Sequence, residues 1–146
     1  LAVESETSSK LTNGRYDYLS MGKHQPVEGL LMKVYESDWK APPLPIKGRG
    51  IQTRYTGPLL SFLRHLNLID TLVYPKDERA VFEAARVFLK TEGHLIAPES
   101  AYAVRAAMDE ALEAKKKGEK KVLVISVSGT LYLDFGEKMG YTSALV

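Results

Sequence analysis

The second half of the chain carries the clearest helical pattern of apolar and polar positions. Apolar residues recur at the i, i+4, i+7 and i+8 spacing that forms one helix face: Val81, Ala85, Phe88 and Leu89. Asp77 is placed to cap the start of this helix, and Gly93 suits a left-handed stop at its end. The pattern therefore predicts one helix between Asp77 and Gly93.

A second helix and a strand are predicted downstream. The helix runs from about Glu99 to Lys117, and Gly118 ends it. Its apolar face is formed by Ala101, Val104, Met108, Ala111 and Leu112. The segment Lys121 to Val127 is a nearly continuous apolar run, which is typical of a strand covered on both faces. The order strand, helix, helix, strand predicts an α/β layer with a parallel sheet.

The first half of the chain gives weaker signals. Leu1 to Val3 reads as the end of a buried strand, and Ile69 to Tyr74 as a short strand. Pro58 to Leu66 reads as a helix with proline at its first position. Gly29 to Tyr35 is predicted as one or two helical turns. The prolines and glycines of Ala41 to Gly50 predict an irregular segment.

Composition places the chain among folded proteins and narrows the candidate partners. Of its 146 residues, 45% are hydrophobic and 26% are charged, which fits a single α/β region spanning 1–146. The net charge of +2 and the lack of a ~20-residue apolar run favour neither nucleic acid nor membrane as a partner. The chain has no cysteine, which fits a cytoplasmic location, and it opens on an apolar run without methionine. We therefore expect residue 1 not to be a natural start.

Two positions are candidates for binding chemistry. Ser128 and Gly129 follow the predicted strand, where open α/β sheets bind ligands. Glu99 begins a predicted helix, where a carboxylate could orient a cofactor. A plain Ser-Gly turn and a glutamate that complements the helix dipole are the alternatives, and the pattern alone favours them. The three histidines lack zinc-ligand spacing, so no metal site is predicted.

Four stretches of the chain resemble tryptophan synthase β chains, and more closely the second, archaeal-type group. They are AVESETSSKLTNGRYDY at 2–18, LLMKVYESDWKAPPLPIKGRG at 30–50, RVFLKTEGHLIAPESAYAVRAAMDEALEAKKKGEKKVLVISVSG at 86–129 and LDFGEKM at 133–139. They occur in the family's order and together resemble the C-terminal third of its chain.

The resemblance implies part of a fold-type II pyridoxal-phosphate enzyme with α/β domains. Ser128 matches the family serine that hydrogen-bonds the pyridine nitrogen of the cofactor, and Gly129 follows it. Glu99 matches the family glutamate beside the cofactor ring. The family's Schiff-base lysine and its glycine-rich phosphate cradle lie upstream of residue 1, so no catalytic residue is expected in this chain. The complete enzyme would make L-tryptophan from indole and L-serine.

Three departures from the family pattern stand out. The family's Ser-Gly-His-Gly or Ser-Gly-Arg-Gly is here Ser128-Gly129-Thr130-Leu131, and Tyr102 replaces a family histidine. The family's Gly-Leu-Arg-Tyr-His-Gly turn corresponds to residues 50–57. Its Arg-Tyr pair aligns either with Arg54-Tyr55 or with Gln52-Thr53. The same loop carries the carbonyl groups of the family's monovalent-cation site.

The resemblance also sets expectations for partners and activity. The first partner is the missing N-terminal portion of the β chain; a homodimer is expected, and a tryptophan synthase α chain is a further candidate. Alone, the chain is expected to form no tryptophan and to bind pyridoxal phosphate weakly or not at all. The alternative is a non-catalytic α/β module for association or regulation. Leu131 and Tyr102 favour this alternative, whereas Glu99 and Ser128 favour the enzyme part.

Overall fold

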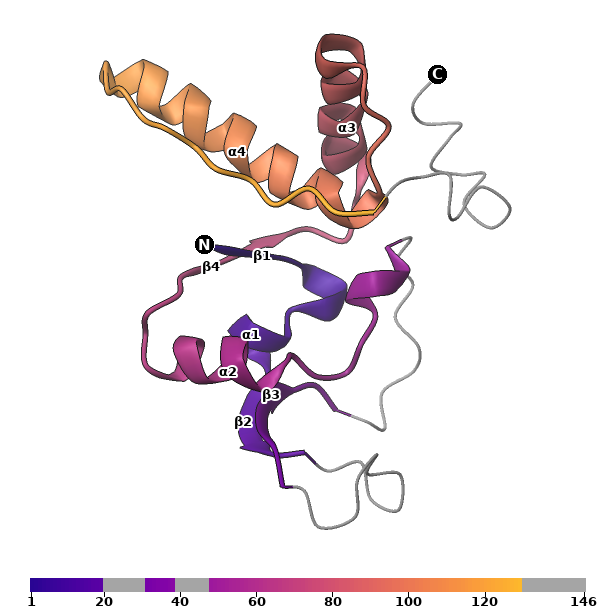
Figure 1. Cartoon of the computed structure of the whole chain (residues 1–146), viewed down its shortest axis with the longest axis vertical. Helices are drawn as coiled ribbons and strands as arrows, with labels where there is room; N and C mark the ends of the chain where they lie inside the picture. Colours follow the sequence, from indigo (N-terminus) through magenta and orange to yellow (C-terminus); the bar gives the residue numbers. More distant parts are fainter. Residues whose placement is uncertain (20–30, 39–47, 130–146) are drawn as a thin grey trace.

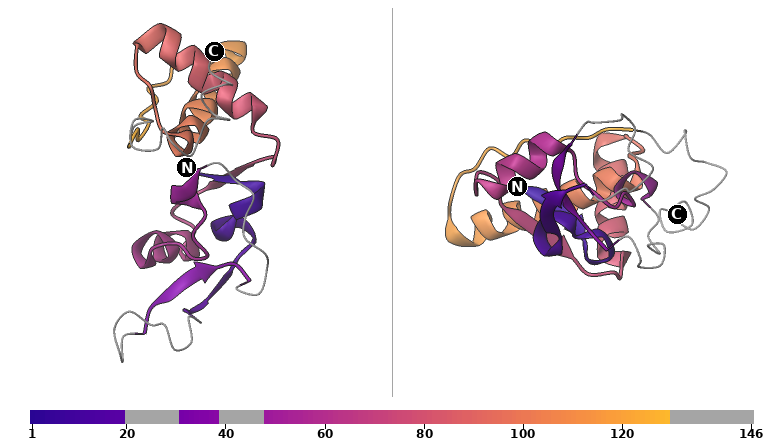
Figure 2. Two further views of the ribbon diagram at one scale, coloured as in Figure 1. Left: turned by 90° about the vertical axis from the view of Figure 1, so that its right-hand side faces the viewer. Right: turned by 90° about the horizontal axis from the view of Figure 1, so that it is seen from below.

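The computed structural model of the protein describes residues 1–19, 31–38 and 48–129. Its helices and strands follow in the order β1 (Ala2–Ser5), η1 (Glu6–Ser8), α1 (Lys10–Asn13), β2 (Arg15–Tyr18), β3 (Lys33–Glu36), η3 (Arg49–Ile51), α2 (Pro58–His65), β4 (Thr71–Tyr74), α3 (Arg79–Glu92) and α4 (Pro98–Lys117). The helices α3 and α4 lie at one end of the molecule, α1, α2, β2 and β3 lie at the other, and β1 and β4 lie between them (Figure 1). Figure 2 shows the same order along the long axis.

The central strands β1 and β4 form a parallel pair. Ala2 lies opposite Thr71 and Ser5 lies opposite Tyr74. Both strands lie within two residues of their predicted positions, and β4 is marked in the sequence by a run of β-branched and aromatic residues. The parallel pairing agrees with the predicted parallel sheet, although this sheet has only two strands among the described residues.

A hydrophobic core lies between α3 and α4. It contains Val81, Phe82, Ala84, Ala85, Ile96, Ala101, Tyr102 and Val104. Gly93 ends α3 and Gly118 ends α4, each with φ of +70°, so both predicted stops are confirmed. The prediction that Asp77 caps α3 is wrong. The residue before α3 is Glu78, and the Asp77 carboxylate instead accepts a hydrogen bond from the Arg79 backbone N–H at 3.2 Å.

The predicted apolar face of α4 is buried only near the start of the helix. Ala101 and Val104 are buried, whereas Ala111 is exposed and Leu112 is 55% exposed. The reason is visible in Figure 1, where the C-terminal part of α4 projects beyond α3. A helical apolar face is therefore present along α4, but α3 covers only its first half.

The predicted strand from Lys121 to Val127 does not form. Residues 121–129 have no strand pairing and run back along α4 in an extended trace (Figure 1). Val122 and Val124 are each 93% exposed, so the expected burial on both faces is also wrong. A strand needs a hydrogen-bonded neighbour, and the described part of the chain offers none beside this segment.

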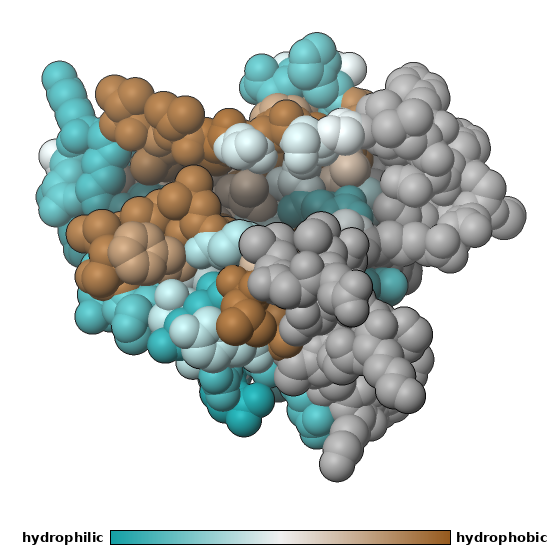
Figure 3. Space-filling model, turned by 60° about the horizontal axis from the view of Figure 1, so that its bottom comes forward, coloured by the Kyte–Doolittle hydropathy of each residue, from teal (hydrophilic) through white to brown (hydrophobic). Residues whose placement is uncertain are grey.

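Figure 3 shows hydrophobic residues exposed on one face of the molecule.

The far end of the molecule contains an antiparallel pair, β2 and β3, in which Tyr16 lies opposite Tyr35. The predicted helical turns at 29–35 are wrong for the described residues, because β3 occupies part of this range. Ser61 of α2 is fully buried: its hydroxyl accepts from the Tyr35 N–H at 3.0 Å and donates to the Thr56 carbonyl at 3.1 Å. These bonds join α2 to β3. Most of the predicted irregular segment, 41–47, lies outside the described residues.

Candidate functional site

Ser100 joins the start of α4 to the end of the extended segment. Its hydroxyl donates to the Ser128 carbonyl at 2.8 Å and accepts from the Ser128 backbone N–H at 3.1 Å. Both bonds are made with the main chain of Ser128. Among the described residues, none forms a hydrogen bond with the Ser128 hydroxyl. The structure therefore brings Ser128 next to Glu99, the residue before Ser100, even though the predicted strand between them is missing.

Glu99 lies against a glycine-containing turn that comes from far along the sequence. Its Oε1 accepts a hydrogen bond from the Gly50 backbone N–H at 2.7 Å. A Cβ added to Gly48 or Gly50 would lie 3.3 Å from Glu99 Cγ, so both positions allow the close approach of this side chain. The Gly-x-Gly spacing at 48–50 is too short for a phosphate loop. Its structural role is to hold Glu99.

Gly129 has a conformation that favours glycine. Its φ is +71°, and an added Cβ would lie 3.3 Å from the Ala97 Cβ. Ala97 directly precedes α4, so the turn at Ser128 and Gly129 packs closely on the helix start. Glu99, Ser128 and Gly129, the three residues predicted to bind cofactor, therefore gather at one end of α4. Thr130 and Leu131 lie outside the described residues.

A cleft of about 570 Å³ runs beside this group of residues. Val3 of β1 lines one wall, the segment 123–126 lines the other, and Glu99 and Tyr102 of α4 contribute to its lining. The side of β1 away from β4 has no strand partner among the described residues. The cleft therefore separates two extended segments that are not paired with each other.

Tyr102, which replaces a family histidine, is part of the core rather than an exposed group. It is 2% exposed, and its hydroxyl donates to Glu78 Oε1 at 3.0 Å. Burial raises the pKa of Tyr102, and the negative charge of Glu78 adds to this. Tyr74 nearby donates to Asp109 Oδ2 at 2.6 Å, and burial with this bond raises its pKa to about 12. Both phenols stay protonated at neutral pH and act as donors.

A buried cluster at the end of β1 was missed by the sequence interpretation. Glu4, which is 8% exposed, accepts from the backbone N–H groups of Leu11 at 2.9 Å and Thr12 at 3.0 Å. Lys10, which is 7% exposed, donates to the Ser8 hydroxyl at 2.9 Å and to the Ile51 carbonyl at 3.1 Å. The sequence gives no sign that these side chains are buried, because helix α1 is only four residues long and shows no periodic apolar face.

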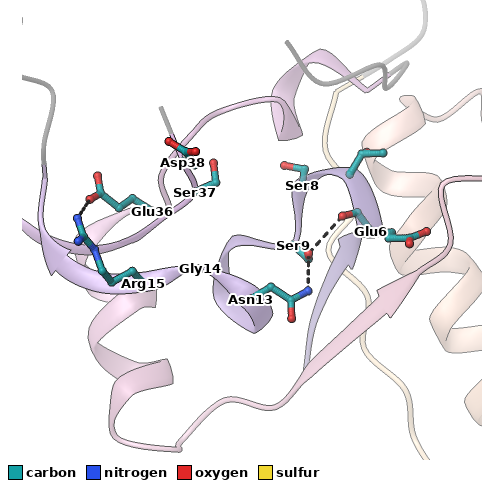
Figure 4. Close-up of a pocket in the computed structure, with 10 residues that line it drawn as sticks. Glu6, Ser8, Ser9, Asn13, Gly14, Arg15, Glu36, Ser37 and Asp38 are labelled. Carbon is teal, nitrogen blue, oxygen red and sulfur yellow. Dashed lines mark hydrogen bonds and ion pairs between the residues drawn. The ribbon is translucent and has the colours of Figure 1, made fainter. Parts of the chain in front are cut away.

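A second cavity, of about 650 Å³, is lined in part by Ser8, the partner of Lys10 in this cluster. Figure 4 shows its polar lining, in which Arg15 pairs with Glu36 at 3.1 Å and Asn13 donates to the Ser9 hydroxyl at 2.8 Å. It shares no lining residue with the cleft beside α4. None of the three residues predicted to bind cofactor lines this cavity, so we place the candidate site at the start of α4.

Within 1–19, 31–38 and 48–129, no three His, Cys, Asp or Glu side chains gather closely enough to hold a metal ion. None of the helices in these ranges has the length and apolar character needed to cross a membrane.

Replacing Ser100 by alanine should loosen the turn at Ser128. The substitution removes two hydrogen bonds and leaves both main-chain groups of Ser128 without this partner, so we expect a loss of about 1–3 kcal/mol in local stability. Hydrogen exchange at the Ser128 amide should accelerate by about tenfold or more. Thr91→Ala, which removes an exposed hydroxyl from α3, is the control and should leave this amide unchanged. Equal exchange in wild type and Ser100→Ala would contradict the assigned role.

No protein-family model matches this chain, but individual proteins match it over nearly its whole length. It is 42% identical over 134 residues to tryptophan synthase beta chain 2 of Aquifex aeolicus, which covers 92% of this chain. It is 38% identical over 145 residues to the protein of the same name from Methanosarcina mazei, covering 98% of this chain. The chain spans only 30% and 31% of the length of these two relatives.

Proposed function

Because this chain belongs to the tryptophan synthase β-chain family and corresponds to its C-terminal part, we propose that it works within a pyridoxal-phosphate enzyme of that kind. The proposed reaction is β-replacement, in which indole and L-serine give L-tryptophan. The gathering of Glu99, Ser100, Ser128 and Gly129 at one end of α4 supports this function best. A cytoplasmic location, which the absence of cysteine fits, belongs to the same proposal.

The residues at this end of α4 fit the ring of the cofactor. Ser100 fixes the main chain of Ser128 through two hydrogen bonds, while the exposed Ser128 hydroxyl is available to a ring nitrogen. Gly129 has no side chain to block a flat ligand. Pyridoxal phosphate, when bound, supplies the electron sink that β-replacement requires. A neutral serine at the ring nitrogen donates or accepts one hydrogen bond without placing a charge there.

Glu99 contributes a carboxylate whose position is set from outside its own helix. The Gly50 N–H binds Oε1, so the side chain is held at the rim of the cleft instead of rotating freely. We propose that this carboxylate orients the cofactor ring from the side. The resemblance places the phosphate cradle upstream of residue 1, so the proposal assigns the phosphate to the rest of the family chain.

The proposed partner is the upstream portion of the family chain, within the roughly 70% of the relatives' length that this chain does not match. The unpaired side of β1 and the exposed apolar segment 121–127 support this partner, because both lack the strand neighbours that their sequences favour. An added strand in the cleft would pair with both. A homodimer and an α-chain partner remain expectations for the assembled protein.

The proposal is tested by co-expressing the chain with the part of the Aquifex aeolicus relative that lies upstream of the matched region. We expect the assembled complex to form tryptophan from indole, serine and pyridoxal phosphate, whereas either part alone forms none. Ser128→Ala in the complex should weaken activity by about fivefold, as the loss of roughly 1 kcal/mol implies. Ser9→Ala, a serine remote from the cleft, is the matched control.

An assembled complex that does not bind the cofactor and does not form tryptophan would count against the enzyme function. That result would favour the non-catalytic association module instead. Turnover by the isolated 146-residue chain would also contradict the proposal, because it would require a catalytic lysine within these residues.

A further inference from the structure

The ammonium group of Lys10 lies against the loop that follows Gly48. Its Nζ donates to the Ile51 carbonyl at 3.1 Å and to the Ser8 hydroxyl at 2.9 Å. The Ser8 hydroxyl itself donates to the same Ile51 carbonyl. A positive charge and a hydroxyl therefore converge on one loop carbonyl.

This loop is where the resemblance implies carbonyl ligands for a monovalent cation, so we tested whether such an ion fits. A carbonyl oxygen has two lone pairs, and at Ile51 both directions are taken by Lys10 and Ser8. Lys10 is also 7% exposed, so its charge is fixed inside the protein rather than extending into solvent. The Ile51 carbonyl does not fit a free cation in addition to these two donors.

Electrostatics reinforce this exclusion. A second positive charge about 4 Å from the ammonium would meet a repulsion that weakens its binding by about a thousandfold at the effective dielectric of a protein surface. Burial lowers the pKa of Lys10, and the negative charge of the Glu4 carboxylate, which accepts from the N–H groups of Leu11 and Thr12, partly offsets this. The cluster thus contains its own cation and its own anion.

We propose that the Lys10 ammonium serves as a tethered monovalent cation for the 50–57 loop, so that this loop takes up no free K⁺, Na⁺ or NH₄⁺. Lys10 and Ser8 hold the loop by the Ile51 carbonyl, and Glu99 holds it by the preceding Gly50 N–H. The tethered charge therefore fixes the turn that positions Glu99. This inference goes beyond the proposed function and does not depend on tryptophan formation.

The first experiment measures the thermal unfolding midpoint of the full 146-residue chain at constant ionic strength. Tetramethylammonium chloride, whose cation is too large for a carbonyl site, is replaced stepwise by KCl, NaCl or NH₄Cl. We expect the wild-type midpoint to change by less than about 1 °C between these salts. Titration with Tl⁺, followed by thallium NMR, should show no saturable binding to the wild type.

The second experiment removes the tethered charge. Lys10→Met keeps most of the side-chain volume and should lower the midpoint by about 5 °C or more in tetramethylammonium chloride. KCl or NH₄Cl should restore at least half of this loss, because a free cation can now reach the vacated position. Lys90→Met removes an exposed lysine of α3 and is the matched control, which should show neither the loss nor the recovery.

Three results would overturn the proposal. The first is selective stabilisation of the wild type by K⁺ or Na⁺, and the second is saturable Tl⁺ binding to the wild type. Neither measurement requires a variant that folds. The third is a Lys10→Met chain whose stability or folding is the same in all four salts, because the position would then have no affinity for a cation.

Discussion

Replacing Tyr102 by alanine is expected to lower the free energy of unfolding by about 3–5 kcal/mol, because it empties the centre of the core between α3 and α4. The side chain is 2% exposed and packs among the buried residues of both helices. Its ring also lies 6.4 Å from the ring of Tyr74, in a tilted arrangement. Urea unfolding followed by circular dichroism would measure the change.

Tyr102→Phe is the matched control, because it keeps the ring and removes only the hydroxyl bonded to Glu78. We expect this variant to lose about 1 kcal/mol at neutral pH. The pKa of Tyr102 is raised by burial above its ordinary value of 10.0. The wild type should therefore lose stability relative to Tyr102→Phe as the pH rises above 10, where only the unfolded tyrosine ionises readily. Equal losses for the alanine and phenylalanine variants would show that the ring contributes no packing.

Replacing Gly14 by alanine is expected to destabilise the other end of the molecule by about 3 kcal/mol. An added Cβ would lie 2.2 Å from the Lys10 carbonyl oxygen and 2.7 Å from the Glu36 carbonyl oxygen. Both obstacles are backbone atoms, so the contact can be relieved only by moving α1 away from β3. The Gly14 N–H also donates to the Lys10 carbonyl at 2.8 Å, and this bond would be strained by the same movement.

Gly57→Ala provides the control for this prediction. No atom lies within 4 Å of a Cβ added at Gly57, and the residue precedes α2 in an extended conformation. We expect a change of at most about 1 kcal/mol, from the weaker preference of alanine for the position before a helix. Chemical denaturation of both variants would compare them directly, and a Gly14→Ala chain as stable as Gly57→Ala would contradict the close contact.

Local sequence pattern by itself determined the two long helices, since their apolar spacing and terminal glycines depend only on neighbours in the chain. It also indicated β1 and β4, whose residues favour extended structure. It gave less for Gly29 to Tyr35, because a short apolar run fits a helical turn or a strand, and only the pairing of β3 with β2 decided between them.

The candidate site divides in the same way. Resemblance to a family pointed to Glu99, Ser128 and Gly129, but it could not show that Ser100 holds Ser128 or that Gly50 holds Glu99, because each bond joins residues at least 28 positions apart. The apolar pattern of 121–127 is typical of a buried strand, but the segment is unpaired and largely exposed. Whether that strand forms was decided by tertiary structure alone, because a strand exists only with a hydrogen-bonded neighbour. The burial of Lys10 was likewise decided by the packing of the Ile51 loop, because a four-residue helix has no periodicity from which an inner face can be read.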